Sequence, residues 1–179
     1  HIRRCIRVRN LINCDLRYDQ YMKNIYTGNN VVITGEVSLS EDVSIWHNAV
    51  LRGDEGSITI GPRTNIQDLV MIHTGMPDYS VIIGHDTTIG HSAIIHGCTI
   101  GDECMIGMGA IIMNGAKIGN QCIEAAGSIV TEHKTFPEKS LILGSPAKVI
   151  RALTDDEIQK IRDNAEAYVT SARKHLTRN

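Results

Sequence analysis

Residues 81–119 read VIIGHDTTIGHSAIIHGCTIGDECMIGMGAIIMNGAKIG, and this stretch decides the fold. An aliphatic residue recurs every six positions here, and after one five-residue step the count resumes in the same way. The aliphatic positions are Ile83, Ile89, Ile95, Ile100, Ile106, Ile112 and Ile118. An α-helix needs a period near 3.6 residues, so these residues are not helical. A hexapeptide period is typical of a solenoid.

The same period extends upstream, at Ile33, Leu39, Ile45, Leu51, Ile60, Ile66 and Ile72. Six residues suit a short strand and a turn, and three such units close a triangular coil of about eighteen residues with its aliphatic side chains on the axis. Small residues and glycine are expected at the corners. Successive coils pair as parallel strands about 4.8 Å apart. Each residue therefore lies directly above its equivalent one coil later.

The chain divides into three predicted parts. Residues 1–22 are rich in arginine, begin without Met, and are interpreted as an N-terminal extension or a remnant of cloning. Residues 23–152 form the β-helix, with loops expected at Glu55–Thr59 and Thr74–Ser80 and a repeat that fades after Val130. Residues 153–179 are predicted to form a helix, because Thr154 and Glu157 make a capping box at its start. This helix is expected to pack back on the β-helix.

Composition excludes several classes of protein. The 179 residues, 42% of them hydrophobic, suit one domain with a sizeable core. A formal net charge of −2 gives no electrostatic case for binding nucleic acid or an anionic membrane surface, and no stretch is apolar for long enough to cross a bilayer. Five cysteines without a CxxC pair indicate no disulfide framework, so the cytoplasm is the expected location.

Two histidines fall in register on one face of the predicted prism. Arg52, His73 and His96 each follow an inward aliphatic residue of that face. Ile72 and Ile95 are 23 positions apart, which is one coil plus five loop residues. His73 and His96 should therefore lie one strand spacing apart, close enough to bind one tetrahedral ion.

A third histidine lies on a different face. His91 comes two residues after Ile89, where it should stack above Asp68. It can join the same ion only if a neighbouring subunit brings its own His91 against His73 and His96, and a closed three-fold ring supplies three such contacts. Four other histidines have no such partner and are interpreted as surface residues: His47, His85, His133 and His175.

Several motifs between about residues 30 and 152 resemble the γ-class carbonic anhydrase-like proteins. These motifs are Trp46–Asp54, Thr64–Asp68 followed by Ile72-His73, Ile89–Cys98, Ile106–Ala110 and Leu143–Ala147. The resemblance implies a left-handed parallel β-helix that forms a homotrimer. It also implies a zinc ion, or alternatively iron or cobalt, held by His73 and His96 of one chain and His91 of the next.

The resemblance also implies roles for polar residues near the ion. Arg52, Asp54 and Asp68 match residues whose guanidinium–carboxylate pairing fixes the interface and orients ligands. Gln67 would hydrogen-bond the metal-bound oxygen or the substrate with help from Asn65, or either amide would serve a turn. Glu55 matches the proton acceptor of active members. No glutamate follows closely behind His73, so Asp78 or Tyr79 would have to replace the acidic loop of prototypical members.

The leading hypothesis is reversible hydration of carbon dioxide to bicarbonate by a metal-bound hydroxide, which three neutral imidazoles and an open coordination position permit at neutral pH. One alternative is a hexapeptide acyltransferase that uses acyl-coenzyme A. Others are a metal-binding scaffold without useful turnover and a thioester or other small-molecule hydrolase. Glu124 occupies an inward position, and we interpret it as a register slip near the end of the solenoid rather than a buried charge.

Overall fold

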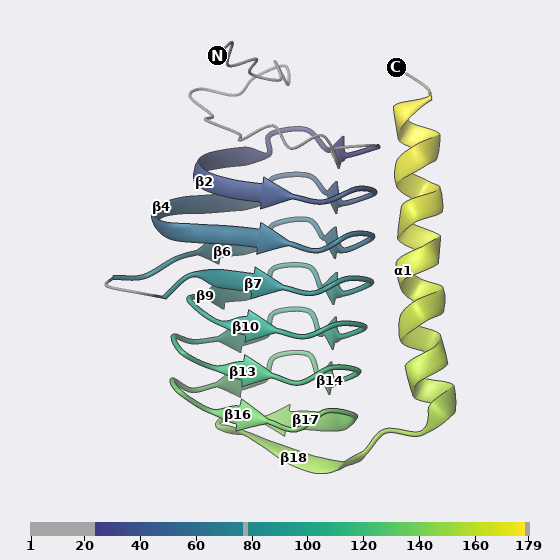
Figure 1. Ribbon diagram of the computed structural model, residues 1–179. Helices are drawn as coiled ribbons and strands as arrows, with labels where there is room; N and C mark the ends of the chain where they lie inside the picture. The colour runs from purple at the N-terminus through teal and green to yellow at the C-terminus, as the bar shows by residue number, and fades with distance from the viewer. Residues whose placement is uncertain (1–23, 77–78, 178–179) are drawn as a thin grey trace.

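The computed structural model describes residues 24–76 and 79–177. They form a left-handed parallel β-helix of triangular section with one long helix beside it (Figure 1). This confirms the predicted fold class. Within the described residues no helix is both long and apolar enough to cross a membrane. The predicted extension over residues 1–22 lies outside the described part of the chain.

One side of the prism, which we call face A, is an eight-stranded sheet. Its strands pair in parallel except for the last two, which are antiparallel. In spatial order they are β1 (Tyr26–Thr27), β3 (Ser44–Ile45), β5 (Asn65–Ile66), β8 (Thr88–Ile89), β11 (Met105–Ile106), β14 (Ile123–Glu124), β17 (Ser140–Gly144) and β18 (Ala147–Ala152).

The other two sides belong to one ten-stranded sheet, because β2 (Val32–Leu39) and β4 (Val50–Ile60) bend around a corner and take part in both sides. Face B contains the first halves of these two strands with β6 (Met71–His73), β9 (Ile94–His96), β12 (Ile111–Ile112) and β15 (Ile129–Val130). Face C contains their second halves with β7 (Val81–Ile83), β10 (Thr99–Ile100), β13 (Lys117–Ile118) and β16 (Thr135–Phe136).

The inward aliphatic residues form the core. On face B, for example, Leu51 pairs with Ile72, Ile72 with Ile95 and Ile95 with Ile112, and all four are fully buried. Stacking branched side chains along the axis fills most of the narrow prism, and Phe136 joins this core near its end. Cys98, Cys104 and Cys122 are free and buried against this core.

The corners use glycine, as expected, and other residues as well. At the corner between faces A and B, Asn48, Leu69 and Ser92 have φ near 60°, and Gly109 and Gly127 follow them with φ of 68°. Glycine is also needed where coils approach closely. A Cβ on Gly107 would lie 2.4 Å from the amide nitrogen of Ala126 in the next coil. A side chain there would force the two coils apart.

Two predicted interruptions fare differently. Residues 55–59 are not a loop: β4 runs through them, and its register with β2 jumps so that Gly35 pairs with Gly53 but Glu36 pairs with Ser57. The extra residues form a bulge at the corner between faces B and C. The chain does leave the prism after β6 and rejoins it at β7, and reciprocal backbone bonds of 3.0 Å between Gly75 and Tyr79 close the base of this excursion.

The repeat does not fade after Val130. β16 pairs in register with β13, and β17 pairs with β14, so a further coil follows. The last coil escaped detection because its inward residues include Phe136 in place of the usual isoleucine. Antiparallel addition of β18 then ends the sheet of face A.

Glu124 is in register and fully buried, so the predicted register slip is wrong. It lies between Ile106 and Ile142 in the inward stack of face A. Neither carboxyl oxygen has a hydrogen-bond partner. Burial raises the pKa of Glu124 to about 8, because the interior does not solvate the charged form.

Helix α1 (Asp155–Leu176) runs beside the prism and covers face A (Figure 1). The predicted capping box is present, with the Thr154 hydroxyl accepting from the Glu157 amide and the Glu157 carboxylate accepting from the Thr154 amide. Its buried side is Ile158, Ile161, Ala165, Val169 and Ala172. A two-pronged contact from Arg162 to Glu103 also ties the helix to the prism and lowers the pKa of Glu103 to about 2.

Candidate metal centre

The predicted stack of Arg52, His73 and His96 is present at the corner between faces B and C. Arg52 pairs with His73 in register, and His73 pairs with His96. The Nδ1 atom of His73 lies 3.0 Å from the Nε2 atom of His96. The stacking rule therefore placed the two imidazoles correctly.

The hydrogen bonds of His73 indicate which of its nitrogens carries the proton. Nε2 lies 3.0 Å from Oδ1 of Asp54, which is an acceptor, so Nε2 donates. Nδ1 lies 3.3 Å from Nη2 of Arg52, which can only donate. The lone pair of Nδ1 is thus the one that faces His96.

His96 is oriented in the complementary way. Its Nδ1 atom lies 2.5 Å from the side-chain oxygen of Asn114 and donates to it. This leaves the lone pair on Nε2, the atom that faces His73. Asn114 was not among the predicted site residues. Its position was available from the count, because Asn114 follows His96 by 18 residues, one regular coil.

These orientations fit a metal ion. Nδ1 of His73 and Nε2 of His96 lie 3.0 Å apart, and the contacts with Asp54 and Asn114 assign the proton of each ring to its other nitrogen. Zinc–nitrogen bonds of about 2.0–2.1 Å at a tetrahedral angle place two ligand nitrogens about 3.3 Å apart, so a small opening of this pair would admit the ion. Within residues 24–76 and 79–177, however, no group of three or more His, Cys, Asp or Glu side chains could hold a metal in one chain.

His91 lies at the corner between faces A and B, above Asp68 as predicted. Its Nδ1 atom is 3.0 Å from Oδ2 of Asp68, and its amide donates to Oε1 of Gln67. The Nδ1 proton is thus held by a carboxylate, and Nε2 is left for another partner. His91 has the same pattern as His73 and His96: an oxygen acceptor on one nitrogen and a lone pair on the other.

Arg52 and Asp54 pair within the chain, through Nη1 and Oδ2 at 2.7 Å. The contact is a single one, and the other carboxylate oxygen, Oδ1 of Asp54, accepts from His73. The Arg52 guanidinium holds the pKa of Asp54 below its ordinary value. Asp68 lies at the other corner and does not join this pair.

The remaining predicted residues divide between the two corners. Glu55 lies near His73, with 4.0 Å between Oε2 and Nε2. Asn65 and Gln67 are buried beneath α1, where Gln67 donates to Asn65 and Asn65 donates to Thr88. Asn164 of α1 donates to the same Thr88 hydroxyl. Helix α1 therefore helps to position Asn65 and Gln67, which lie on the His91 side of the prism.

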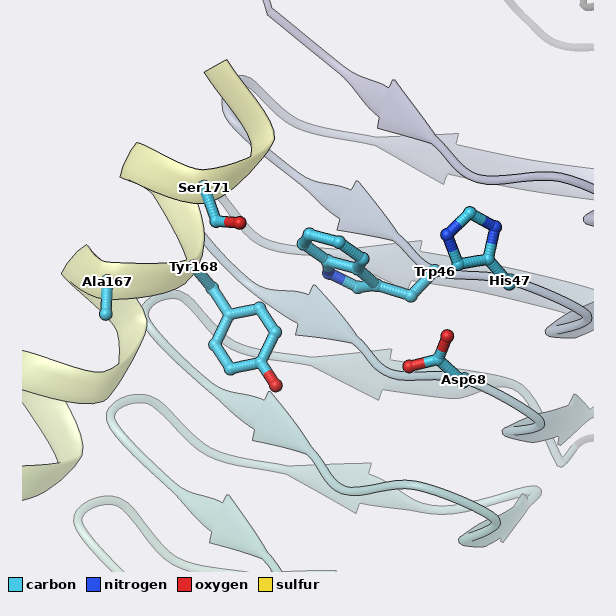
Figure 2. A pocket seen from close by; sticks show the side chains of 6 residues that line it. All are labelled: Trp46, His47, Asp68, Ala167, Tyr168 and Ser171. Atoms are coloured by element: carbon cyan, nitrogen blue, oxygen red, sulfur yellow. The ribbon is translucent and has the colours of Figure 1, made fainter. Parts of the chain in front are cut away.

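A cavity of about 430 Å³ lies between α1 and the corner that carries His91. Figure 2 shows its lining: Trp46, His47, Asp68, Ala167, Tyr168 and Ser171. Trp46 and Tyr168 meet edge to face, with ring centroids 5.5 Å apart. Burial, and then the negative charge of Asp68, raise the pKa of Tyr168. The carboxylate that holds His91 thus also borders this cavity.

The fold and the six-residue repeat define this chain as a hexapeptide-repeat β-helix protein. A family model described as the hexapeptide repeat of succinyl-transferase matches residues 80–114 and 98–132. A solved structure of a hexapeptide transferase family protein from Anaplasma phagocytophilum is similar, at 38% identity and a TM-score of 0.81, over 89% of this chain and 92% of that one.

Two similar proteins indicate which family of hexapeptide-repeat proteins this chain belongs to. A probable carbonic anhydrase of Methanocaldococcus jannaschii is 47% identical over 82% of this chain and 92% of its own length. The mitochondrial gamma carbonic anhydrase 2 of Arabidopsis thaliana is 36% identical over 88% of this chain, and the match spans 58% of that relative's length. The chain belongs to the γ-class carbonic anhydrase-like family of hexapeptide-repeat proteins.

Proposed function

We propose that the protein is a homotrimer in which face B turns toward a three-fold axis. The outward residues of face B form an apolar column: Val32, Val50, Met71, Ile94, Ile111 and Ile129. Val32 and Ile94 are 43% and 40% exposed, an unfavourable arrangement for an isolated chain. His91 borders one edge of face B and the His73–His96 pair borders the other. Three-fold closure through face B would therefore bring these edges together.

In this trimer His73 and His96 of one chain and His91 of the partner subunit would hold a zinc ion, with iron or cobalt as alternatives. The observation that carries the proposal is the 3.0 Å contact between Nδ1 of His73 and Nε2 of His96, while Asp54 and Asn114 accept from the other nitrogen of each ring. Asp54, Asn114 and Asp68 fix the three rings in the required orientation. The free, buried thiols agree with a reducing compartment such as the cytoplasm.

The supported activity is reversible hydration of carbon dioxide to bicarbonate. Zinc held by three neutral imidazoles lowers the pKa of bound water to about 7 and so supplies hydroxide at neutral pH. Gln67 would orient the reacting oxygen from the His91 side, with Asn65 and Thr88 holding its amide in place. Glu55 would accept a proton beside His73, and the Arg52–Asp54 pair would keep His73 in its orientation.

Stopped-flow carbon dioxide hydration by the zinc- or iron-loaded protein tests this function. We expect a rate well above background that is lost in the double variant His73→Ala, His96→Ala, with the metal lost in parallel. Full metal occupancy with only background hydration would contradict the enzymatic proposal and favour a metal-binding scaffold. The double variant His47→Ala, His85→Ala is a control with the same number of histidines removed.

An acyltransferase is the second candidate, and the transferase name of the similar Anaplasma phagocytophilum structure favours it. Such an enzyme would bind acyl-coenzyme A and would need no metal. Saturable binding of coenzyme A to metal-free protein, unchanged in the His73→Ala, His96→Ala variant, would support this alternative.

A further inference from the structure

A tyrosine–histidine pair lies beside the candidate metal centre and has no part in the function proposed above. The Tyr79 hydroxyl is 3.5 Å from Nε2 of His133, and their ring centroids are 5.8 Å apart. Tyr79 is fixed by its reciprocal backbone bonds with Gly75 at the base of the Thr74–Ser80 loop. His133 is exposed, so its ring can exchange protons with solvent.

Asn114 connects this pair to His96. The His133 amide donates to the backbone oxygen of Asn114, whose side chain accepts from Nδ1 of His96. Two coil spacings, about 10 Å, separate the backbones of His96 and His133. The His133 ring extends back over Gly115, where an added Cβ would lie 2.4 Å from its Nδ1 atom. A proton that crosses from the candidate metal centre to His133 would therefore have to travel through water.

Hydration of carbon dioxide makes this position useful. Each turnover converts carbon dioxide and water into bicarbonate and one proton, and that proton must reach bulk buffer before the next turnover. Histidine is the side chain best suited to this transfer near neutral pH. We propose that His133, oriented by Tyr79, receives the proton through water and passes it to solvent. The inference rests on the proposed hydration activity, and it revises the interpretation of His133 as a bare surface residue.

Glu55 offers an alternative route for the proton. Glu55 lies on the other side of the stack, 4.0 Å from His73. Its carboxylate is exposed and is the acceptor implied by family resemblance. The two routes predict different losses, because only the His133 route requires the Tyr79 hydroxyl. Tyr79→Phe should therefore weaken transfer through His133 and leave transfer through Glu55 intact.

The test uses His133→Asn, because His133 has φ near 59° and asparagine tolerates that conformation without titrating. At low buffer concentration we expect kcat for hydration to fall on the order of tenfold, with kcat/KM unchanged and activity restored by added imidazole. His85→Asn, at a different corner, should have no effect. An unchanged kcat in His133→Asn, or an equal fall in kcat and kcat/KM, would overturn the assignment.

A second measurement does not depend on turnover. In protein loaded with Co²⁺, the ring protons of His133 should show a strong paramagnetic shift or broadening by NMR, and those of His85 should not. Absence of this effect would place His133 too far from the ion and overturn the proposal. Background hydration by the loaded wild-type protein would instead refute the proposed function, and the role of His133 with it.

Discussion

Each candidate histidine ligand is held by one oxygen acceptor from the same chain. Asp54 holds His73, Asn114 holds His96 and Asp68 holds His91. Such contacts fix the tautomer and the ring orientation before any ion arrives, so less freedom is lost on binding. Each candidate ligand is therefore oriented by its own chain, although no three such side chains meet within the described residues.

Glu124 should make the protein less stable at high pH. Its pKa in the folded protein is about 8, above the value of 4.5 for an unburied glutamate. The folded protein therefore binds the Glu124 proton more tightly than the unfolded chain does. The contribution of Glu124 to the free energy of unfolding is full below about pH 4.5 and is lost as the pH rises through 8. At about 1.4 kcal/mol per pKa unit, the loss is on the order of a few kcal/mol.

Glu124→Gln should remove most of this loss, because the amide does not ionise. The measurement is the urea midpoint at pH 5 and pH 9 for the wild type, Glu124→Gln and the exposed control Glu132→Gln. We expect the wild type and Glu132→Gln to weaken together as the pH rises. An equal pH dependence in all three proteins would show that Glu124 is not the titrating group.

Some residues of the site were predictable from sequence and others were not. Register alone placed His73 against His96 and His91 above Asp68, because the repeat converts sequence spacing into distance. Asn114 was missed because an amide beside a regular corner looks like a turn residue. Glu124 was misinterpreted because the pattern predicts an aliphatic residue at every inward position. Glu124 occupies an inward position in the correct register, but its side chain is a carboxyl group.

At the scale of elements, the three faces have different environments. Face A is covered by α1, and face C is mainly polar outward, with Ser38, Thr59, Thr99, Lys117 and Thr135. Face B has an apolar outward column and no covering element in the described residues. The hexapeptide pattern predicted the inward residues well. It could not assign the outward ones, because what covers a face depends on α1 and on other chains.

Face B should therefore be sensitive to charge. Ile94 on face B and Ile82 on face C are 40% and 50% exposed, which makes them a matched pair. Ile94→Glu should convert the trimer to monomers, since it would place three carboxylates near the three-fold axis. Ile82→Glu should leave the trimer intact. Sedimentation velocity of both variants measures this, and a trimeric Ile94→Glu protein would rule out face B as the interface.

For the whole molecule, the decisive property is that the proposed site is divided between chains. His73 and His96 lie at one edge of face B and His91 at the other, so that His96 and His91 flank opposite ends of β9. Every interface would then use one edge from each of two subunits. Metal binding, assembly and activity should rise and fall together, because removing either edge from every chain removes every site.

Mixing two inactive variants tests this division directly. His91→Ala and His96→Ala should each lack metal and activity as pure proteins. When they are co-expressed in equal amounts, about a quarter of the interfaces in randomly assembled closed trimers join an intact His73–His96 edge to an intact His91, so metal content and hydration should recover to about that fraction. Co-expression of His73→Ala with His96→Ala is the matched control, because both changes damage the same edge and no interface is restored. Recovery in this control, or none in the first mixture, would show that the site is not shared in this way.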